Sequence, residues 1–243
     1  MSNTLIIIPV RMASKRFPGK PMVNIQGKQM ILRVWEKAVL SKIGDVIIAC
    51  CDEEIKNLLY EKNIPFIMTK KNLNSGTDRV YQAFKKIKNK KKYKYIINLQ
   101  GDLPTINPKH IKQLCSIIKI RNINIATLVS KIKEEKKISQ ESIVKVVLGK
   151  KKGKNFKVIY FSRAPIPLNA IKYYEHVGIY AYTSKTLKEF VNLKSSRLEM
   201  IEQLEQLRAI ENNLEIYAGE INNSPISIDV PDDIKLLLKD KTI

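Results

Sequence analysis

Short apolar runs alternate with amphipathic segments along the first half of the chain. The apolar runs predict strands at 5–9, 45–51, 64–68, 93–99 and 124–128. The segments between them repeat apolar residues at helical spacing and predict helices at 29–40, 53–62, 77–88 and 108–120. Alternation of strands and helices at this spacing predicts an α/β fold, with a parallel sheet covered by helices on both faces.

The second half has a different pattern, with a β-rich stretch in place of regular alternation. Residues 143–148 and 155–161 flank a turn rich in Gly and Lys and predict an antiparallel pair. The remaining elements that we expect are strands at 176–182 and 215–218, helices at 187–192 and 198–212, and a final helix from Pro231. Because there is no internal repeat or linker, the sequence predicts a single domain over residues 1–243, with a β-rich elaboration at roughly 143–183.

The composition indicates a globular protein that neither crosses nor anchors to a membrane. Hydrophobic residues make up 44% and charged residues 28% of the chain, which is ordinary for a globular domain. No apolar run approaches the length of about 18 residues that a membrane span requires, and residues 5–8 are too few for a signal peptide core. Cys50, Cys51 and Cys115 lie in apolar contexts and predict reduced, buried thiols. We therefore expect a cytoplasmic protein.

A formal net charge of +21 raises the alternative of a basic nucleic-acid-binding protein. The lysines cluster at 85–92 and 150–154, without the interleaved aromatic or arginine residues of a nucleic-acid stacking surface. We interpret the charge as a general property that attracts anionic substrates, and we expect no nucleic-acid partner.

The segment after the first strand carries the strongest chemical signal. Arg11, Lys15, Arg16 and Lys20 alternate with small and turn-forming residues, and Pro9 ends the strand. A stiff cationic loop at the carboxyl end of the first strand of an α/β protein is a suitable place for a polyanionic ligand. A solvated basic loop is the alternative.

Two carboxylates follow short apolar runs elsewhere in the chain. Asp102 comes after the 93–99 strand, beside Gly101, which would let a ligand approach the backbone closely, and Asp229 precedes Pro231 at a predicted helix start. Carboxylates at strand ends are suitable ligands for Mg²⁺ next to phosphates. Each could instead be a turn or capping residue.

Four further motifs contain polar residues at the ends or on one face of predicted elements. Ser75 and Gly76 precede a helix and could face an anion, although Ser75 also suits a simple N-cap. Arg163 follows a strand and could bind a carboxylate in a bidentate manner. His176 and Tyr180 lie on one face of a strand by their spacing of two, and the 198–212 helix has a buried apolar stripe with an exposed Glu and Gln face.

Taken in order, these motifs resemble those of the 3-deoxy-manno-octulosonate cytidylyltransferase (CMP-Kdo synthetase) family. They read IIIPVRMASKRFPGKP, SGTDR, NLQGD, YFSRAPIP, HVGIYAY, LEQLRAIEN and DVPDDI. The resemblance covers nearly the whole chain. It implies a Rossmann-like nucleotide-diphosphosugar transferase fold, with a mostly parallel central sheet and a β-rich elaboration that forms a homodimer.

The resemblance also implies an activity and a set of residue roles. The anomeric hydroxyl of Kdo would attack the α-phosphate of CTP, giving CMP-Kdo for lipopolysaccharide synthesis and pyrophosphate. The implied CTP-binding residues are Arg11, Ser14, Arg16, Lys20, Ser75, Arg79 and Gln100, with Arg11 and Lys20 also catalytic. Asp102 and Asp229 would be catalytic and would bind Mg²⁺. The sugar would be held by Arg163, His176, Tyr180, Glu205 and Gln206.

Four features depart from the family's usual sequence. Val10 stands where Ala is common, Leu103 where Glu follows the metal-binding Asp, and Leu73 where a His precedes the SGT motif. The residues before Asp229 read SPISI, where a Gly-containing turn is typical. The alternatives that remain are an enzyme for 8-amino-Kdo or for a sialic-acid-like sugar and, from a different class, the nucleic-acid-binding protein.

Overall fold

The computed structural model describes residues 2–14 and 16–239, and these residues form two compact units. The first unit comprises Met1–Lys112 and Pro225–Ile243, and the second comprises Gln113–Ser224. The C-terminal segment therefore belongs to the same unit as the N-terminal half. That the whole chain acts as a single domain stays a prediction.

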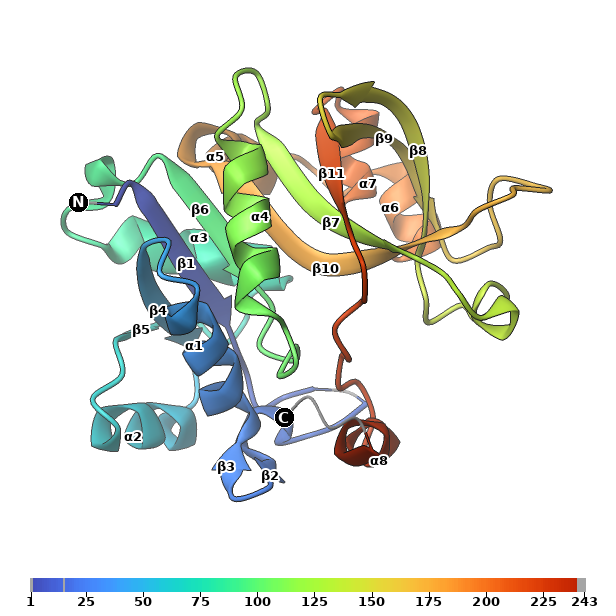
Figure 1. Cartoon of the computed structure of the whole chain (residues 1–243). Helices are drawn as coiled ribbons and strands as arrows, with labels where there is room; N and C mark the ends of the chain where they lie inside the picture. The colour runs from blue at the N-terminus through green and yellow to red at the C-terminus, as the bar shows by residue number, and fades with distance from the viewer. Residues whose placement is uncertain (1, 15, 240–243) are drawn as a thin grey trace. The chain divides into compact units, whose positions relative to one another are not determined.

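The first unit is built on a parallel sheet in the order β5-β4-β1-β6 (Figure 1). Its strands are β1 (Thr4–Pro9), β4 (Asp45–Cys50), β5 (Phe66–Met68) and β6 (Tyr95–Leu99). Every residue of β1 and β6 is buried, as expected of strands that are apolar on both faces. Because the strands are parallel, the loops after β1 and β6 leave from the same edge of the sheet.

Helices and a small hairpin complete this unit. The helices are α1 (Met30–Leu40), α2 (Glu53–Glu61), α3 (Gly76–Lys86) and α8 (Asp232–Lys239), with short 3₁₀ turns at Lys20–Met22 and Lys90–Lys92. The hairpin is β2 (Asn24–Ile25) with β3 (Lys28–Gln29), and α4 (Pro108–Ile118) continues into the second unit. Helix α1 contacts β4, and α3 contacts β1 and β4. The predicted strands and helices of the first half are confirmed, with ends displaced by a few residues.

A small apolar cluster attaches the C-terminal segment to the basic loop of this unit. Ile228 and Leu237 are fully buried against Ile25 and Met30, and Phe17 packs on the same cluster. This packing brings Asp229, the residue after Ile228, to the segment that carries Arg16 and Lys20.

The second unit contains a mixed sheet in the order β10-β7-β11-β9-β8. Its strands are β7 (Ile125–Lys131), β8 (Lys145–Lys152), β9 (Asn155–Ser162), β10 (Tyr174–Thr183) and β11 (Ile216–Ile221). Strand β11 is parallel to β7, and the other neighbours are antiparallel. The β8–β9 hairpin, visible beside β11 in Figure 1, confirms the predicted antiparallel pair.

The predicted continuous helix over 198–212 is wrong. The segment forms α6 (Arg197–Glu202) and α7 (Leu207–Glu211), and Gln203 ends α6 in the left-handed conformation with a φ of 55°. The expected buried stripe is also interrupted, because Ile201 is 65% exposed while Leu204 and Leu207 are buried. The other helices of this unit are α5 (Ser184–Asn192) and a 3₁₀ turn at Glu135–Lys137.

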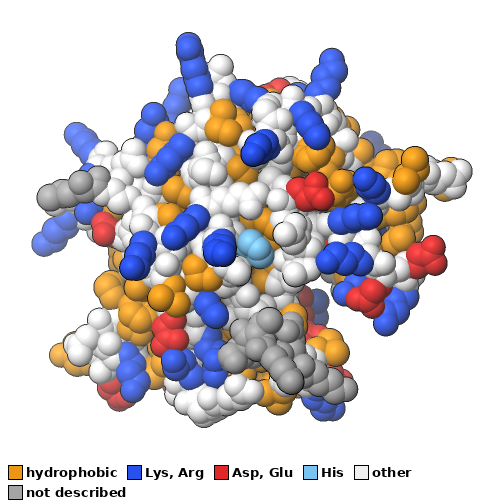
Figure 2. Space-filling view, in the orientation of Figure 1, with side chains coloured by type: hydrophobic (Ala, Val, Ile, Leu, Met, Phe, Trp, Pro, Cys, Tyr) orange, Lys and Arg blue, Asp and Glu red, His pale blue; other side chains and the backbone are white. Residues whose placement is uncertain are grey.

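The surface and the thiols agree with the composition. Cys50, Cys51 and Cys115 are buried, as predicted, and burial raises the pKa of the Cys50 thiol to about 12. Within residues 2–14 and 16–239, no helix combines the length and the apolar character needed to cross a membrane. Lys and Arg side chains are scattered over the face in Figure 2 and do not gather in a single band there.

Candidate functional site

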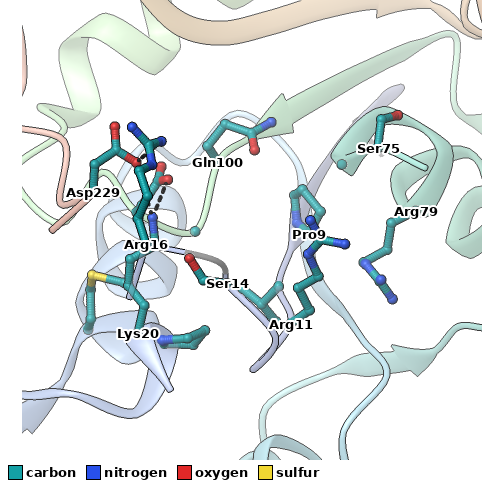
Figure 3. A pocket seen from close by; sticks show the side chains of 15 residues that line it. Pro9, Arg11, Ser14, Arg16, Lys20, Ser75, Arg79, Gln100 and Asp229 are labelled. Carbon is teal, nitrogen blue, oxygen red and sulfur yellow. Dashed lines mark hydrogen bonds and ion pairs between the residues drawn. The ribbon is translucent and has the colours of Figure 1, made fainter. Parts of the chain in front are cut away.

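A cavity of about 350 Å³ opens in the first unit where the loops after β1 and β6 meet the start of α3 (Figure 3). All the residues predicted to contact CTP or the metal line this cavity: Arg11, Ser14, Arg16, Lys20, Ser75, Arg79, Gln100, Asp102 and Asp229. Lys15, the remaining cation of the basic loop, lies outside the described residues. The structure therefore brings together segments from four separate parts of the sequence, and the roles of the individual residues stay predictions.

Backbone hydrogen bonds fold the basic loop into a compact turn. The carbonyl of Met12 accepts from the amides of Ser14 at 2.8 Å and of Gly19 at 3.0 Å. Gly19 adopts a φ of 74°, a conformation that glycine reaches without strain, and starts the 3₁₀ turn that carries Lys20. The exposed Arg11 guanidinium has no hydrogen-bond partner among the described residues. The loop thus presents cations from a fixed backbone.

Asp52, to which no sequence motif points, holds this loop from outside. Its Oδ2 accepts from the backbone amide of Met12 at 2.9 Å, and its side chain makes no cap on α2, the helix that it precedes. An Asp before a helix predicts an N-cap, and nothing in the sequence signals a contact forty residues away.

Lys20 lies between the two predicted metal ligands. Its Nζ donates to Asp102 Oδ2 at 2.8 Å and to the Ile228 carbonyl at 2.7 Å, and lies 3.5 Å from Asp229 Oδ1. Arg16 Nη2 donates to the same Asp229 oxygen at 2.9 Å (Figure 3). The Lys20 side chain is only 12% exposed. Its ammonium group has three N–H donors and faces three acceptor oxygens, which hold it in place.

This arrangement fits a divalent cation. Asp102 and Asp229 already converge on one positive charge, and Mg²⁺ typically binds through one or two carboxylates together with substrate phosphates. Over residues 2–14 and 16–239, no cluster of three or more His, Cys, Asp or Glu could enclose a metal by itself. A metal held here would therefore take further oxygen ligands from water or from substrate phosphates.

The opposite side of the cavity is formed by the start of α3. Ser75 Oγ accepts from the amide of Asp78 at 3.0 Å and caps this helix, as the simpler interpretation expected. Ser75 and Gly76 line the cavity, so the positive end of the helix dipole borders it. A Cβ on Gly76 would lie 3.3 Å from Gln100 Oε1, so the helix start packs closely against Gln100.

Arg79 lines the cavity but is already engaged with protein oxygens. The residue is 2% exposed, and its Nη1 donates to the Thr69 hydroxyl and, at 3.1 Å, to the Lys70 carbonyl. These bonds tie the segment after β5 to α3, which gives Arg79 a structural explanation besides its predicted contact with CTP.

Other parts of the protein pack closely against Gly101. The sequence suggested only that a ligand would approach this glycine, because it follows a strand. A Cβ at this position would lie 2.5 Å from Val10 Cγ1 and 3.2 Å from the Pro9 carbonyl oxygen. Leu103, at 4% exposure, is buried in the core, and neither Leu103 nor Leu73 lines the cavity. Val10, by contrast, does line it.

Two of the predicted sugar ligands lie side by side on β10 in the second unit. The rings of His176 and Tyr180 are 5.2 Å apart, and Phe161 packs edge-on to His176 at 5.1 Å. His176 Nε2 lies 3.1 Å from Thr127 Oγ1, and burial lowers the pKa of this imidazole to about 3. The imidazole is therefore neutral at physiological pH.

Two buried polar atoms of the second unit lack partners among the described residues. They are the hydroxyl of Tyr180 and the Nε2 of Gln206, in residues that are 8% and 9% exposed. Burial raises the pKa of Tyr180 well above its usual value of 10, with smaller contributions from Tyr182 and Glu205, so its hydroxyl stays protonated and can donate. Buried polar atoms without partners are costly, so both atoms are suited to a ligand.

Arg163 is engaged by backbone carbonyls. Its Nε donates to the Glu202 carbonyl at 3.0 Å, its Nη1 to the Glu141 carbonyl at 2.9 Å and its Nη2 to the Gln203 carbonyl at 3.4 Å. A guanidinium has five N–H donors, so one remains on each terminal nitrogen. Its predicted contact with a sugar carboxylate would have to use these two.

Comparison with known proteins agrees with this chemistry. A family model described as cytidylyltransferase matches residues 5–216. The chain is similar to the 3-deoxy-manno-octulosonate cytidylyltransferase of Paramagnetospirillum magneticum, with 37% identity over 95% of this chain and 94% of that protein. It is equally similar to the enzyme of that name from Bartonella bacilliformis, with 37% identity over 97% of each chain.

Solved structures give the same result. A CMP:2-keto-3-deoxy-manno-octonic acid synthetase complexed with CTP matches with a TM-score of 0.89 and 33% identity over 97% of each chain. A cytidylyltransferase from Leptospira borgpetersenii matches at a TM-score of 0.62 and 15% identity, a likeness of fold alone. These likenesses confirm the nucleotidyltransferase fold expected from the motifs.

Proposed function

Because this chain belongs to the 3-deoxy-manno-octulosonate cytidylyltransferase family, we propose that it transfers the cytidylyl group of CTP to the anomeric hydroxyl of Kdo. The products are CMP-Kdo, for lipopolysaccharide synthesis, and pyrophosphate. The observation that carries this proposal is the cavity that gathers every residue predicted to contact CTP or the metal.

The reaction replaces one phosphorus–oxygen bond by another. The sugar oxygen forms a bond to the α-phosphorus of CTP, the bond from that phosphorus to the β-phosphate oxygen breaks, and pyrophosphate leaves with the electron pair. The hydroxyl proton passes to solvent. Such chemistry depends on positioning and charge neutralisation rather than on a protein nucleophile. Arg11, Arg16 and Lys20 supply cations for the triphosphate, and the amide end of α3 supplies a further positive field.

Mg²⁺ would be held by Asp102 and Asp229. When bound, it supplies a Lewis acid that neutralises phosphate charge and lowers the pKa of the attacking hydroxyl. The chain's own contribution is to hold the two carboxylates together, which the Ile228 amide supports by donating to the Asp102 carbonyl at 3.0 Å.

The second unit supplies the sugar contacts in this proposal. The Tyr180 hydroxyl and the Gln206 amide are the buried atoms that need partners, and the sugar's hydroxyl and carboxylate oxygens are suitable ones. Glu205, adjacent to Gln206, is assigned to the same role. Neutral His176 would take part as a hydrogen-bonding group and not as a cation.

A cytoplasmic homodimer is part of the proposal. Large apolar side chains stand exposed in the second unit, among them Ile159 at 48%, Leu168 at 86% and Ile171 at 98%. Exposed apolar residues in such numbers suit an interface between copies of the chain. Light scattering behind size exclusion should give about twice the mass of 28.0 kDa, and a monomer would remove the dimer from the proposal.

Pyrophosphate release tests the reaction directly. The purified chain is mixed with CTP, Mg²⁺ and one acid sugar from a panel of Kdo, 8-amino-Kdo and a sialic acid, and ATP, GTP and UTP replace CTP in controls. We expect release with CTP and Kdo, lost on chelation of the metal. Release with 8-amino-Kdo alone would change the sugar, and release with none of the three sugars would remove the enzyme assignment.

A further inference from the structure

The end of β9 and the end of α6 are joined by reciprocal hydrogen bonds centred on one carboxylate. Glu202 Oε1 accepts from the Ser162 hydroxyl at 2.7 Å, and Oε2 accepts from the Arg163 amide at 2.9 Å. In return, the Arg163 guanidinium donates to the carbonyls of Glu202 and Gln203. The YFSRAPIP motif is therefore joined to Glu202 and Gln203, the two residues directly before the LEQLR motif.

This assembly lies immediately before the predicted sugar ligands Glu205 and Gln206. Gln203 ends α6 in the left-handed conformation, Leu204 is buried, and α7 begins at Leu207. A helix end leaves its last carbonyls without partners, and here the Arg163 side chain satisfies two of them. The positions of Glu205 and Gln206 therefore depend on where α6 is stopped.

The carboxylate of Glu202 also offsets buried positive charge. Lys145 is fully buried and donates to the carbonyls of Gln140 at 2.9 Å and Ile143 at 2.7 Å. Burial lowers the pKa of this ammonium, and the charge of Arg163 lowers it further, whereas Glu141 and Glu202 act in the opposite direction. Removing Glu202 would leave the cations of Lys145 and Arg163 with less negative charge nearby to offset them.

From these contacts we infer that Glu202 is a positioning residue for the sugar site. It fixes the turn that presents Glu205 and Gln206 by holding Ser162 and Arg163, and Arg163 acts first as a clamp on this turn. The inference rests on the proposed function for its kinetic consequence, whereas the clamp itself needs no substrate.

Kinetics with Glu202→Gln and Glu202→Ala test the consequence. Glutamine keeps one acceptor oxygen and alanine keeps none, so the KM for Kdo should rise about 5-fold and about 30-fold respectively, because hydrogen bonds to a charged acceptor are the stronger ones. The KM for CTP should change less than about 2-fold. Glu189→Ala, at an exposed position on α5, serves as the control and should leave both constants unchanged.

Hydrogen exchange on the protein without substrates tests the clamp separately. Amides of the 203–208 segment should exchange at least about 10-fold faster in Glu202→Ala than in the parent chain, while those of β1 stay protected. Ser162→Ala, which removes a single hydroxyl, should give a smaller acceleration and a KM effect of about 2-fold, and it covers the case in which Glu202→Ala does not fold.

Together the two experiments distinguish a structural clamp by Glu202 from a role of Glu202 in positioning the sugar ligands. Unchanged exchange in both variants would overturn the clamp, whatever the activity. Faster exchange together with an unchanged KM for Kdo would overturn the positioning role and keep the clamp structural. If the parent chain releases no pyrophosphate, the proposed function fails while the exchange result still decides whether Glu202 orders the turn.

Discussion

The cavity of the first unit is lined by opposed charges, whereas His176, Tyr180 and Arg163, which we assign to the sugar in the second unit, are neutral or engaged with backbone carbonyls. In the first unit, Lys20 and Arg16 pair with Asp102 and Asp229 at an accessible surface. In the second, His176 and Tyr180 are kept neutral by burial, and Arg163 is engaged with carbonyls. The first set suits a triphosphate, which requires charge to be neutralised, and the second suits a polyhydroxylated acid, which requires directional hydrogen bonds.

The largest effect is expected at Asp102, where the charge of the first-unit cavity can be removed without changing the shape of the side chain. Asp102→Asn keeps the shape of the side chain but removes the charge that faces Lys20, so turnover should fall at least about 100-fold in a pyrophosphate assay. Asp232→Asn, in the exposed ion pair with Lys235 on α8, is the matched control and should retain full activity. Near-normal activity of Asp102→Asn would remove this residue from the metal site.

A second test separates the two units through Lys20. Lys20→Met removes the ammonium that lies between the carboxylates, so CTP affinity measured by calorimetry should weaken about 10-fold or more. The KM for Kdo should stay within about 2-fold, because no cation of the second unit is touched. Lys235→Met, whose side chain is 78% exposed, provides the control. An equal loss for both substrates would contradict the division of roles.

Removing the Tyr180 hydroxyl should affect stability and sugar binding in opposite directions. Because the hydroxyl is buried without a partner among the described residues, Tyr180→Phe should keep or raise the free energy of unfolding, by up to about 1 kcal/mol. If the sugar is its missing partner, the KM for Kdo should rise about 5-fold to 10-fold. Lower stability with unchanged KM would indicate a structural hydroxyl. Tyr182→Phe is the neighbouring comparison.

The last test concerns the pH dependence of the free energy of unfolding. His176 has a folded pKa of about 3 against about 6.5 when unfolded, so the unfolded chain binds an extra proton between these values. The free energy of unfolding is therefore unaffected by this titration above pH 6.5 and decreases as the pH falls below that value. His176→Gln should therefore reduce the slope of unfolding free energy against pH by up to about 1.4 kcal/mol per unit near pH 5. His110→Gln, the other histidine, whose pKa burial also lowers, should change it less. An unchanged slope in His176→Gln would indicate a titrating, exposed imidazole.

The sequence predicted the first unit well because its signals are local. Continuous apolar runs at β1 and β6 determine buried parallel strands, and the residues that follow such strands must meet at one edge. That rule predicts that the loops carrying Lys20 and Asp102 leave from the same edge, whereas the contact between the two side chains depends on the turn between Met12 and Gly19. The return of Asp229 to the same place depends on the packing of Ile228, which a sequence motif could suggest but no periodicity could show.

The second unit was predicted less well because its decisive contacts are distant. The apolar spacing of 198–212 is compatible with one helix, and the break at Gln203 depends on donors from Arg163, about forty residues earlier. Glu202 resembles every other Glu on that segment, so its partners could not be anticipated. Asp52 was missed in the first unit for the same reason.

Because Gly101 packs against Val10, the residue that can be accepted at position 101 during evolution depends on the residue at position 10. A methyl group at Gly101 would overlap Val10 Cγ1 at 2.5 Å, but it would lie 3.2 Å from the Pro9 carbonyl oxygen, a distance that small shifts can absorb. The order in which substitutions arrive therefore matters: Gly101→Ala should be tolerated after Val10→Ala and damaging before it. Thermal unfolding of the two single variants and the double variant would measure this dependence as a coupling energy, and additive effects would exclude it. The valine at position 10 thus restricts which residues the adjacent loop can acquire.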